Sequence, residues 1–225
     1  MSKLTIYTYE WLPEFPRGFV RDMRIRWVAE EVGREYEIAT VPVYPKSPDH
    51  RARQPFAQVP MIEEGEVSLF ESGAIVLHLA EGSALLPDDK RPEITQWVIA
   101  ALNSVEPAVM NWMTSQLSKD MPDIFGPAAS QELEAYMKKF MDGRLAALEE
   151  LLATRDWISG GFSAADIILV EVLRPAENVG ALKDFPAVTG YLERATARPA
   201  FKKAMADHMK HWTDADARRA EKQPA

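Results

Sequence analysis

An acid and a hydroxyl stand side by side at the start of an expected helix. Glu71 and Ser72 follow an expected strand at residues 67–70 and precede an apolar helical pattern at residues 75–79. Serine is a preferred N-cap residue, and the free N–H groups of a helix N-terminus bind carboxylates. The Glu71 carboxylate can pair with an ammonium group. The pair therefore suits the head group of an α-amino acid, and the alternative is that Ser72 only caps the helix.

A second place that could bind a peptide comes just before this pair. Val59 and Pro60 lead into a hairpin at residues 61–70, in which Gly65 supplies the positive φ of a tight turn. A peptide bond before proline can be cis, and such a bond would turn the backbone of Val59 outward to pair with an extended peptide. A γ-linked peptide ligand would use both places.

The composition bounds the classes of function. The chain has 225 residues, of which 47% are hydrophobic, and a net charge of −8 without a basic face, so a globular protein is favoured over one that binds nucleic acid. It has no cysteine, which excludes a cysteine nucleophile and thiolate metal sites. His208 and His211 are three residues apart without a third ligand in view, so we expect no metal. Without a signal peptide or a long apolar run, the cytoplasm is the default location.

The elements that would position these residues fall into two groups. Strands are expected at residues 4–9 and 36–41 with a helix at 18–32 between them, and the hairpin and its helix complete a βαβ–ββα order. After residue 92 only helical patterns remain, with a disturbance at Pro107. This predicts an α/β, thioredoxin-like N-terminal domain and an all-α C-terminal domain. The expected division is residues 1–82, a linker at 83–92, a helical domain at 93–212 and a charged tail at 213–225.

Two separated motifs resemble one known family. The run KSPDHRARQPFAQVP (Lys46–Pro60) and the later LFES (Leu69–Ser72) look like the glutathione-binding half of the glutathione S-transferases, nearest to plant-type and bacterial members that read KSP…NPFGQVP…ES. The stretch WISGGFSAADI (Trp157–Ile167) is similar to the helical domain of that family. There Ser163 and Asp166 form a capping box that serves folding.

The resemblance implies an activity and its partners. The chain would be a non-cysteine glutathione transferase that takes glutathione as co-substrate, stabilises its thiolate and transfers it to a small hydrophobic electrophile. It would be a cytoplasmic homodimer with a role in detoxification, and would need no metal, nucleic acid or membrane. The matching positions imply the following glutathione contacts: Lys46, Gln58, Val59, Pro60, Glu71 and Ser72.

The residue that activates the thiol is left open. A free thiol has a pKa near 8.5, so the protein must aim a donor or a positive charge at the sulfur. Alignment of PRGFVRDMRIRW with the family pattern places Arg17 where the family has Ser or Cys. Arg17 could act by its charge, aided by a helix N-terminus at residues 18–19. Tyr7 or Tyr9 could instead supply a hydroxyl, or the thiol is not activated.

The second substrate would lie beside apolar side chains of the first loop and the first long helix. The candidates are Trp11, Leu12, Phe15, Met110 and Met113. Packing in the core is the alternative for such side chains. Two other functions stay open on the same fold: a protein that binds glutathione or an apolar ligand with little turnover, and a protein-interaction module.

Overall fold

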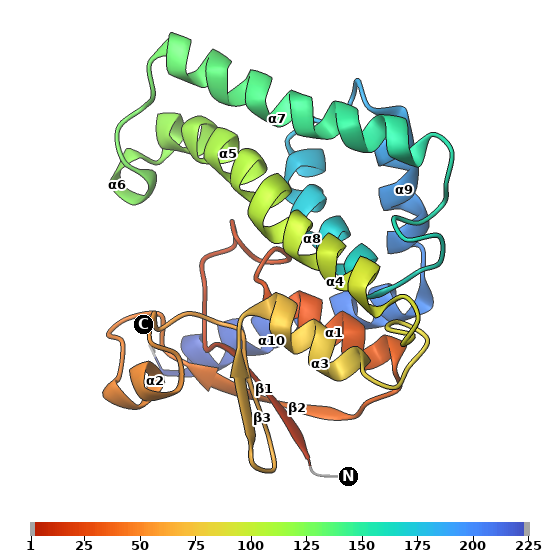
Figure 1. Cartoon of the computed structure of the whole chain (residues 1–225). Coiled ribbons are helices and arrows are strands. Elements are labelled where there is room, and N and C mark those ends of the chain that lie inside the picture. Colours follow the sequence, from red (N-terminus) through yellow and green to blue (C-terminus); the bar gives the residue numbers. More distant parts are fainter. Residues whose placement is uncertain (1–2, 223–225) are drawn as a thin grey trace. The chain divides into compact units, whose positions relative to one another are not determined.

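The computed structural model describes residues 3–222, which form two compact units (Figure 1). The N-terminal unit takes the described parts of Met1–Pro87 and Thr196–Ala225, and the helical unit takes Asp88–Ala195. Residues 1–2 and 223–225, which belong to the expected first domain and tail, lie outside the described part. Within residues 3–222, no helix combines the length and apolar character needed to cross a membrane.

The N-terminal unit is built on a four-stranded sheet. The strands are β1 (Leu4–Tyr9), β2 (Tyr36–Val41), β3 (Met61–Glu64) and β4 (Val67–Phe70), in the order β2-β1-β3-β4. β1 runs parallel to β2 and antiparallel to β3. Gly65 has a φ of 61° in the turn between β3 and β4, which confirms the predicted hairpin.

Three helices of this unit follow the predicted order, but the first begins later than expected. α1 spans Asp22–Glu31, α2 spans Pro48–Arg53 and α3 spans Ser72–Ala80. The sequence predicts a helix from residue 18, yet Gly18 has a φ of 87° and the preceding residues form turns. Since an α-helix needs negative φ, it starts only at Asp22. The helix N-terminus expected at residues 18–19 is therefore absent from that place.

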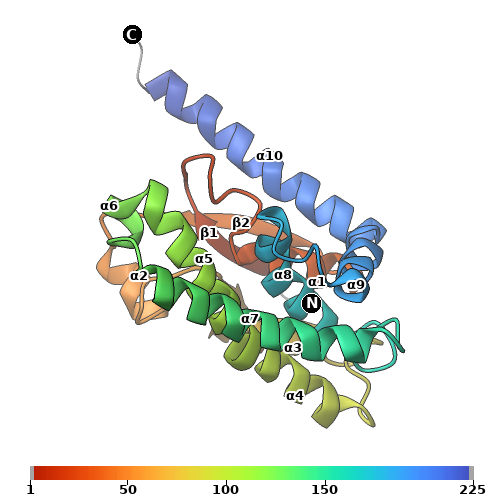
Figure 2. The ribbon, with the colours of Figure 1, turned by 90° about the horizontal axis from the view of Figure 1, so that it is seen from above.

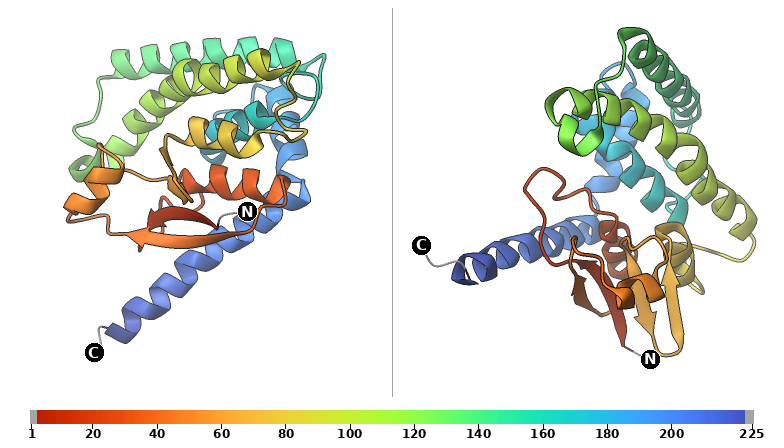
Figure 3. Two further views of the ribbon diagram at one scale, coloured as in Figure 1. Left: turned by 60° about the horizontal axis from the view of Figure 1, so that its bottom comes forward. Right: turned by 90° about the vertical axis from the view of Figure 1, so that its left-hand side faces the viewer.

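The last helix, α10 (Pro199–Lys222), belongs to the N-terminal unit and packs against α1. The sequence predicts a helix ending near residue 211 in the helical domain, followed by a charged tail. Figures 2 and 3 show instead one continuous helix to the end of the described chain. Trp212 and Ala215 are buried on its inner face, and this burial stabilises helix beyond residue 211.

A buried polar network joins α10 to α1. The His208 Nδ1 lies 3.3 Å from the Asp22 carboxylate, and the Trp212 indole N–H donates to the His208 Nε2 at 3.1 Å. The Arg26 Nε–H donates to the same carboxylate at 2.8 Å. Burial acts to raise the pKa of Asp22, but His208 and Arg26 outweigh it and hold that pKa below its usual value.

The helical unit has one irregular long helix and several regular ones. Its elements are α4 (Arg91–Ala100), the π-helical η1 (Ala101–Val105), α5 (Glu106–Asp120), α6 (Pro122–Phe125), α7 (Gln131–Leu152), α8 (Ala164–Asn178) and α9 (Pro186–Thr196). The disturbance predicted at Pro107 is present as the π-helical turn just before it. Proline has no N–H for an intrahelical bond, and such turns accommodate the loss.

The predicted capping box lies at the buried start of α8. The Asp166 carboxylate accepts from the N–H and the hydroxyl of Ser163, each at 2.8 Å, and from the Tyr191 hydroxyl at 2.9 Å. It also accepts the Ile158 N–H at 3.0 Å. These bonds connect the start of α8 to the loop before it and to α9, which is the folding role the sequence indicates.

Replacing Ser163 by alanine should lower the free energy of unfolding by about 1–2 kcal/mol, because a cap and a buried hydrogen bond are lost together. Urea unfolding followed by circular dichroism measures the change. Ser130 caps α7 at an exposed position, where its hydroxyl accepts from the Leu133 N–H, so Ser130→Ala is the matched control and should cost less. Equal losses in the two variants would contradict a special role for the buried box.

Candidate functional site

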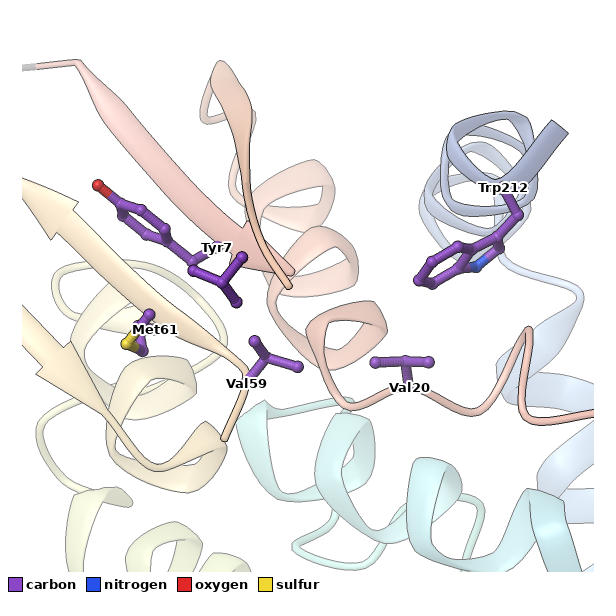
Figure 4. Close-up of a cluster of buried hydrophobic side chains, with 6 residues drawn as sticks. Tyr7, Val20, Val59, Met61 and Trp212 are labelled. Carbon is purple, nitrogen blue, oxygen red and sulfur yellow. The ribbon is translucent and has the colours of Figure 1, made fainter. Parts of the chain in front are cut away.

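The loop before β3 brings Val59 into a cluster that unites several elements of the N-terminal unit. The bond between Val59 and Pro60 is cis, one of the two forms that a bond before proline can take. The Val59 side chain is buried with Tyr7, Val20, Met61 and Trp212, which come from β1, the turn before α1, β3 and α10 (Figure 4). Among the backbone–backbone hydrogen bonds that lie outside the helices and strands of residues 3–222, none uses Val59.

Glu71 and Ser72 lie at the N-terminus of α3, which begins one residue earlier than predicted. Glu71 is the N-cap residue and Ser72 is the first helical residue, so the expected Ser72 cap is wrong. The reason is the backbone of Glu71, whose φ of 70° breaks the strand conformation there. Its side chain is exposed and makes no capping bond. The carboxylate is therefore open to a ligand beside the helix N-terminus.

The Ser72 hydroxyl is positioned by a buried arginine. Ser72 is 5% exposed, and its Oγ accepts from the Arg24 Nη1 at 2.9 Å. This bond uses the oxygen of the hydroxyl and leaves its hydrogen for donation to an anion. No sequence pattern identifies Arg24, because an arginine in a helix is usually exposed, and only the packing of α1 against α3 places this one at Ser72.

Lys46 and Gln58 lie near the same part of the sheet. The Lys46 Nζ is 4.7 Å from the centre of the Tyr9 ring and donates to the Tyr9 hydroxyl at 3.4 Å. Burial, and then the nearby Arg51, lower the pKa of Lys46. Gln58 has an exposed side chain, and its carbonyl accepts from the Nε2–H of the buried His50 at 3.0 Å. His50 positions the backbone next to Val59, and the sequence carries no pattern that identifies it.

The two tyrosines of β1 pack on one cluster but have different hydroxyl environments. The Tyr7 hydroxyl donates to the Glu63 carboxylate at 2.6 Å, so it is committed within the protein, and burial and Glu63 raise its pKa. The Tyr9 hydroxyl accepts from Lys46, which leaves its hydrogen available. Burial raises the pKa of Tyr9, so this group stays a neutral donor at physiological pH. Of the two, Tyr9 is the one able to donate to a ligand.

The Arg17 guanidinium is hydrogen-bonded within the N-terminal unit to a backbone carbonyl and to a carboxylate. Its guanidinium donates to the Leu12 carbonyl at 3.1 and 2.7 Å, and to the two Asp216 carboxylate oxygens at 2.6 and 2.7 Å. The hydrogen bonds from Arg17 lower the pKa of Asp216 to about 2. The carboxylate is therefore ionised at neutral pH and offsets the charge of Arg17, which leaves less positive potential for a thiolate.

The predicted side chains of the second-substrate site come from both units. In the N-terminal unit, Phe15 is 51% exposed at the tip of its loop, Leu12 packs against the Val59 cluster and the Trp11 indole N–H donates to Asp216 at 2.8 Å. In the helical unit, Met110 and Met113 lie on α5, with Met113 buried and Met110 partly buried. Phe15 thus presents apolar surface on its own unit.

No group of three metal-ligating side chains exists among the residues that the structure describes. His208 and His211 instead contact the Asp22 carboxylate and the Tyr9 carbonyl, at 3.3 and 2.9 Å.

Comparison with known proteins gives the class to which this fold and site belong. Residues 16–81 match the family model of the glutathione S-transferase N-terminal domain, and residues 120–208 match that of the C-terminal domain. Glutathione S-transferase F11 of Arabidopsis thaliana is 34% identical over 176 residues, which are 71% of this chain and 79% of that protein. A probable glutathione S-transferase of Oryza sativa subsp. japonica, GSTF2, is 30% identical over 189 residues, or 78% of this chain and 86% of that one.

A solved structure of a glutathione transferase has a fold similar to that of this chain. A glutathione transferase from Burkholderia graminis, with two glutathione molecules bound per subunit, superposes with a TM-score of 0.71 at 25% identity. The match covers 91% of this chain and 88% of that one. The fold is that of the thioredoxin-like and helical domains predicted from the sequence. The chain belongs to the glutathione S-transferase family.

Proposed function

We propose that this chain is a glutathione transferase that binds reduced glutathione in its N-terminal unit and transfers the thiolate to a small hydrophobic electrophile. The observation that carries the proposal is the main chain of Val59, which makes no backbone–backbone hydrogen bond outside the helices and strands of the described residues, in the unit that holds Glu71 and Ser72 at the start of α3. An extended peptide can pair with Val59, and its amino-acid end can meet the acid and the hydroxyl.

The charged and polar groups of the proposed site fit the two ends of glutathione. The exposed Glu71 carboxylate would bind the γ-glutamyl ammonium, while the Ser72 hydroxyl and the N–H groups of α3 would bind its carboxylate. Lys46 would bind the glycine carboxylate, with Gln58 beside it. Val59, held next to Pro60, would pair with the cysteinyl unit.

We assign activation of the thiol to Tyr9 in preference to Arg17 and Tyr7. Tyr9 packs on the Val59 cluster and retains a hydrogen to donate, whereas Tyr7 binds Glu63 and Arg17 binds Asp216. A donor at the sulfur favours the thiolate over the thiol. Lowering the thiol pKa by about two units requires roughly 2.7 kcal/mol of preferential stabilisation of the anion.

Two experiments test this function. Calorimetry with reduced glutathione should show binding, and a conjugation assay with a chlorinated nitroaromatic should show turnover. The pairing of Arg17 with Asp216 favours one alternative, a glutathione- or apolar-ligand-binding protein with little turnover. Tight binding without thiolate absorbance at neutral pH would support that alternative, and absence of binding would contradict both functions.

We also propose that the chain forms a homodimer. Its location would be the cytoplasm, where thiols such as that of glutathione are kept reduced. Each unit exposes apolar side chains, which are typical of an interface when they gather on one face. Leu133, Tyr136 and Phe140 recur at helical spacing along α7, and Tyr44 and Phe56 are exposed on the N-terminal unit.

Sedimentation equilibrium should give twice the mass of the chain. Replacing Tyr136 by glutamate should shift the protein toward the monomer, because burial of a charge in an interface is costly. A monomeric wild-type protein at micromolar concentration would contradict the dimer.

A further inference from the structure

The C-terminal helix contacts the chain on both sides of the loop that follows β1. The His211 Nε2 lies 2.9 Å from the Tyr9 carbonyl, just before the loop. Five residues further along α10, Asp216 accepts from the Trp11 indole and from Arg17. Trp212, between them on the helix, packs in the Val59 cluster, against which Leu12 also packs.

These contacts close the loop at its base. Asp216 binds the side chains of Trp11 and Arg17, which are the two ends of the loop, and Arg17 in turn binds the Leu12 carbonyl. We call these three side chains, Trp11, Arg17 and Asp216, the Asp216 cluster. Arg219 adds a contact with the face of the Trp11 ring, at 4.0 Å from the ring centre. The paired Arg17 bonds are charge-assisted and bidentate, which fixes direction as well as distance.

Through the Asp216 cluster, the conformation of the loop depends on Asp216, which is 199 positions from Arg17 in the sequence. A loop that carries exposed apolar side chains in water gains little from its own packing and needs such external bonds to hold one conformation. Phe15 lies at the loop tip, four residues after Trp11 and two before Arg17, so both residues that Asp216 binds are close to it along the chain.

We propose that Asp216 is a positioning residue that holds the loop at residues 11–17 in the conformation that receives the electrophile. This inference rests on the proposed transferase function. Asp216 itself would touch neither glutathione nor the electrophile, and it would act through Trp11 and Arg17. Specificity for the second substrate would then depend on the last turns of α10.

The test compares Asp216→Asn with Asp214→Asn. Asp214 is the matched control, because it is an acid on the same helix whose partner, Lys210, is on that helix too. We expect Asp216→Asn to raise the KM for a chlorinated nitroaromatic about tenfold, since small displacements of positioning groups have effects of this size or larger. The dissociation constant for glutathione should change less than twofold in both variants.

Hydrogen exchange gives a readout that requires no turnover. Amides of residues 11–17 should exchange faster in Asp216→Asn than in Asp214→Asn, while those of β1 and β3 stay unchanged. Trp11→Phe removes the indole N–H that donates to Asp216, together with part of the ring that Arg219 contacts. Trp11→Phe should reproduce part of the increase in KM and in exchange rate. Combining Trp11→Phe with Asp216→Asn should have a smaller effect on the free energy of electrophile binding than the sum of the two single changes.

Two results would overturn the inference, and they differ from failure of the function. If Asp216→Asn matched Asp214→Asn in both KM and exchange, the cluster would have no positioning role. If glutathione affinity fell as much as electrophile affinity, Asp216 would support the unit as a whole and not the loop. Absence of glutathione binding by the wild-type protein would contradict the proposed function, and the exchange data would still decide whether Asp216 orders the loop.

Discussion

Replacing Tyr9 by phenylalanine should lower kcat/KM for conjugation about 100-fold, the effect typical of removing one donor to a developing or stabilised anion. The ring packs against the Val59 cluster and would be kept, so the fold and the affinity for glutathione should change little. The acid limb of the pH–rate profile should move to higher pH, because the bound thiol loses the donor that lowers its pKa.

Tyr7→Phe is the matched control for this prediction. Tyr7 lies two residues earlier on β1 and loses only its bond to Glu63, so activity should stay close to wild type. Replacing Arg17 by methionine completes the comparison. A large loss in the Arg17 variant, with full activity in Tyr9→Phe, would assign the activation to Arg17 and contradict the role given to Tyr9.

Replacing Glu71 by glutamine should weaken glutathione binding between about 10- and 100-fold, which corresponds to the 1.5–3 kcal/mol of one charge-assisted hydrogen bond. The change keeps the size of the side chain and its backbone requirement, because glutamine meets the same constraint at a φ of 70°. Calorimetry with reduced glutathione measures the loss.

The control for Glu71 is an acid on the same unit that has no place in the proposed site. Glu66 is exposed in the turn between β3 and β4, so Glu66→Gln should bind glutathione like the wild-type protein. A glutathione analogue without the α-amino group should bind the wild-type protein and Glu71→Gln with similar affinity. If Glu71→Gln kept full affinity for glutathione, the ammonium would have another partner.

Local sequence patterns predicted the elements that use common turn and helix chemistry. The hairpin with Gly65 and the capping box at Ser163 and Asp166 are both confirmed. Each depends on residues close together in sequence, where side-chain type limits the backbone directly. The overall fold class follows from the order of such elements and is also confirmed.

The features that the sequence did not reveal depend on contacts between distant residues. The positive φ at Glu71 moves the helix start by one residue, and no side-chain preference indicates it. The residues after 212 read as a charged tail, yet Asp216 binds a loop near the N-terminus. Arg24 and His50 are polar residues whose burial only the tertiary structure determines.

A crystal structure with reduced glutathione bound tests the central claim most directly. We expect the cysteinyl main chain to pair with Val59, the γ-glutamyl end to contact Glu71 and Ser72, and the sulfur to lie within about 3.5 Å of the Tyr9 hydroxyl. A tripeptide bound elsewhere on the chain, or a sulfur directed away from Tyr9 and toward Arg17, would contradict this account.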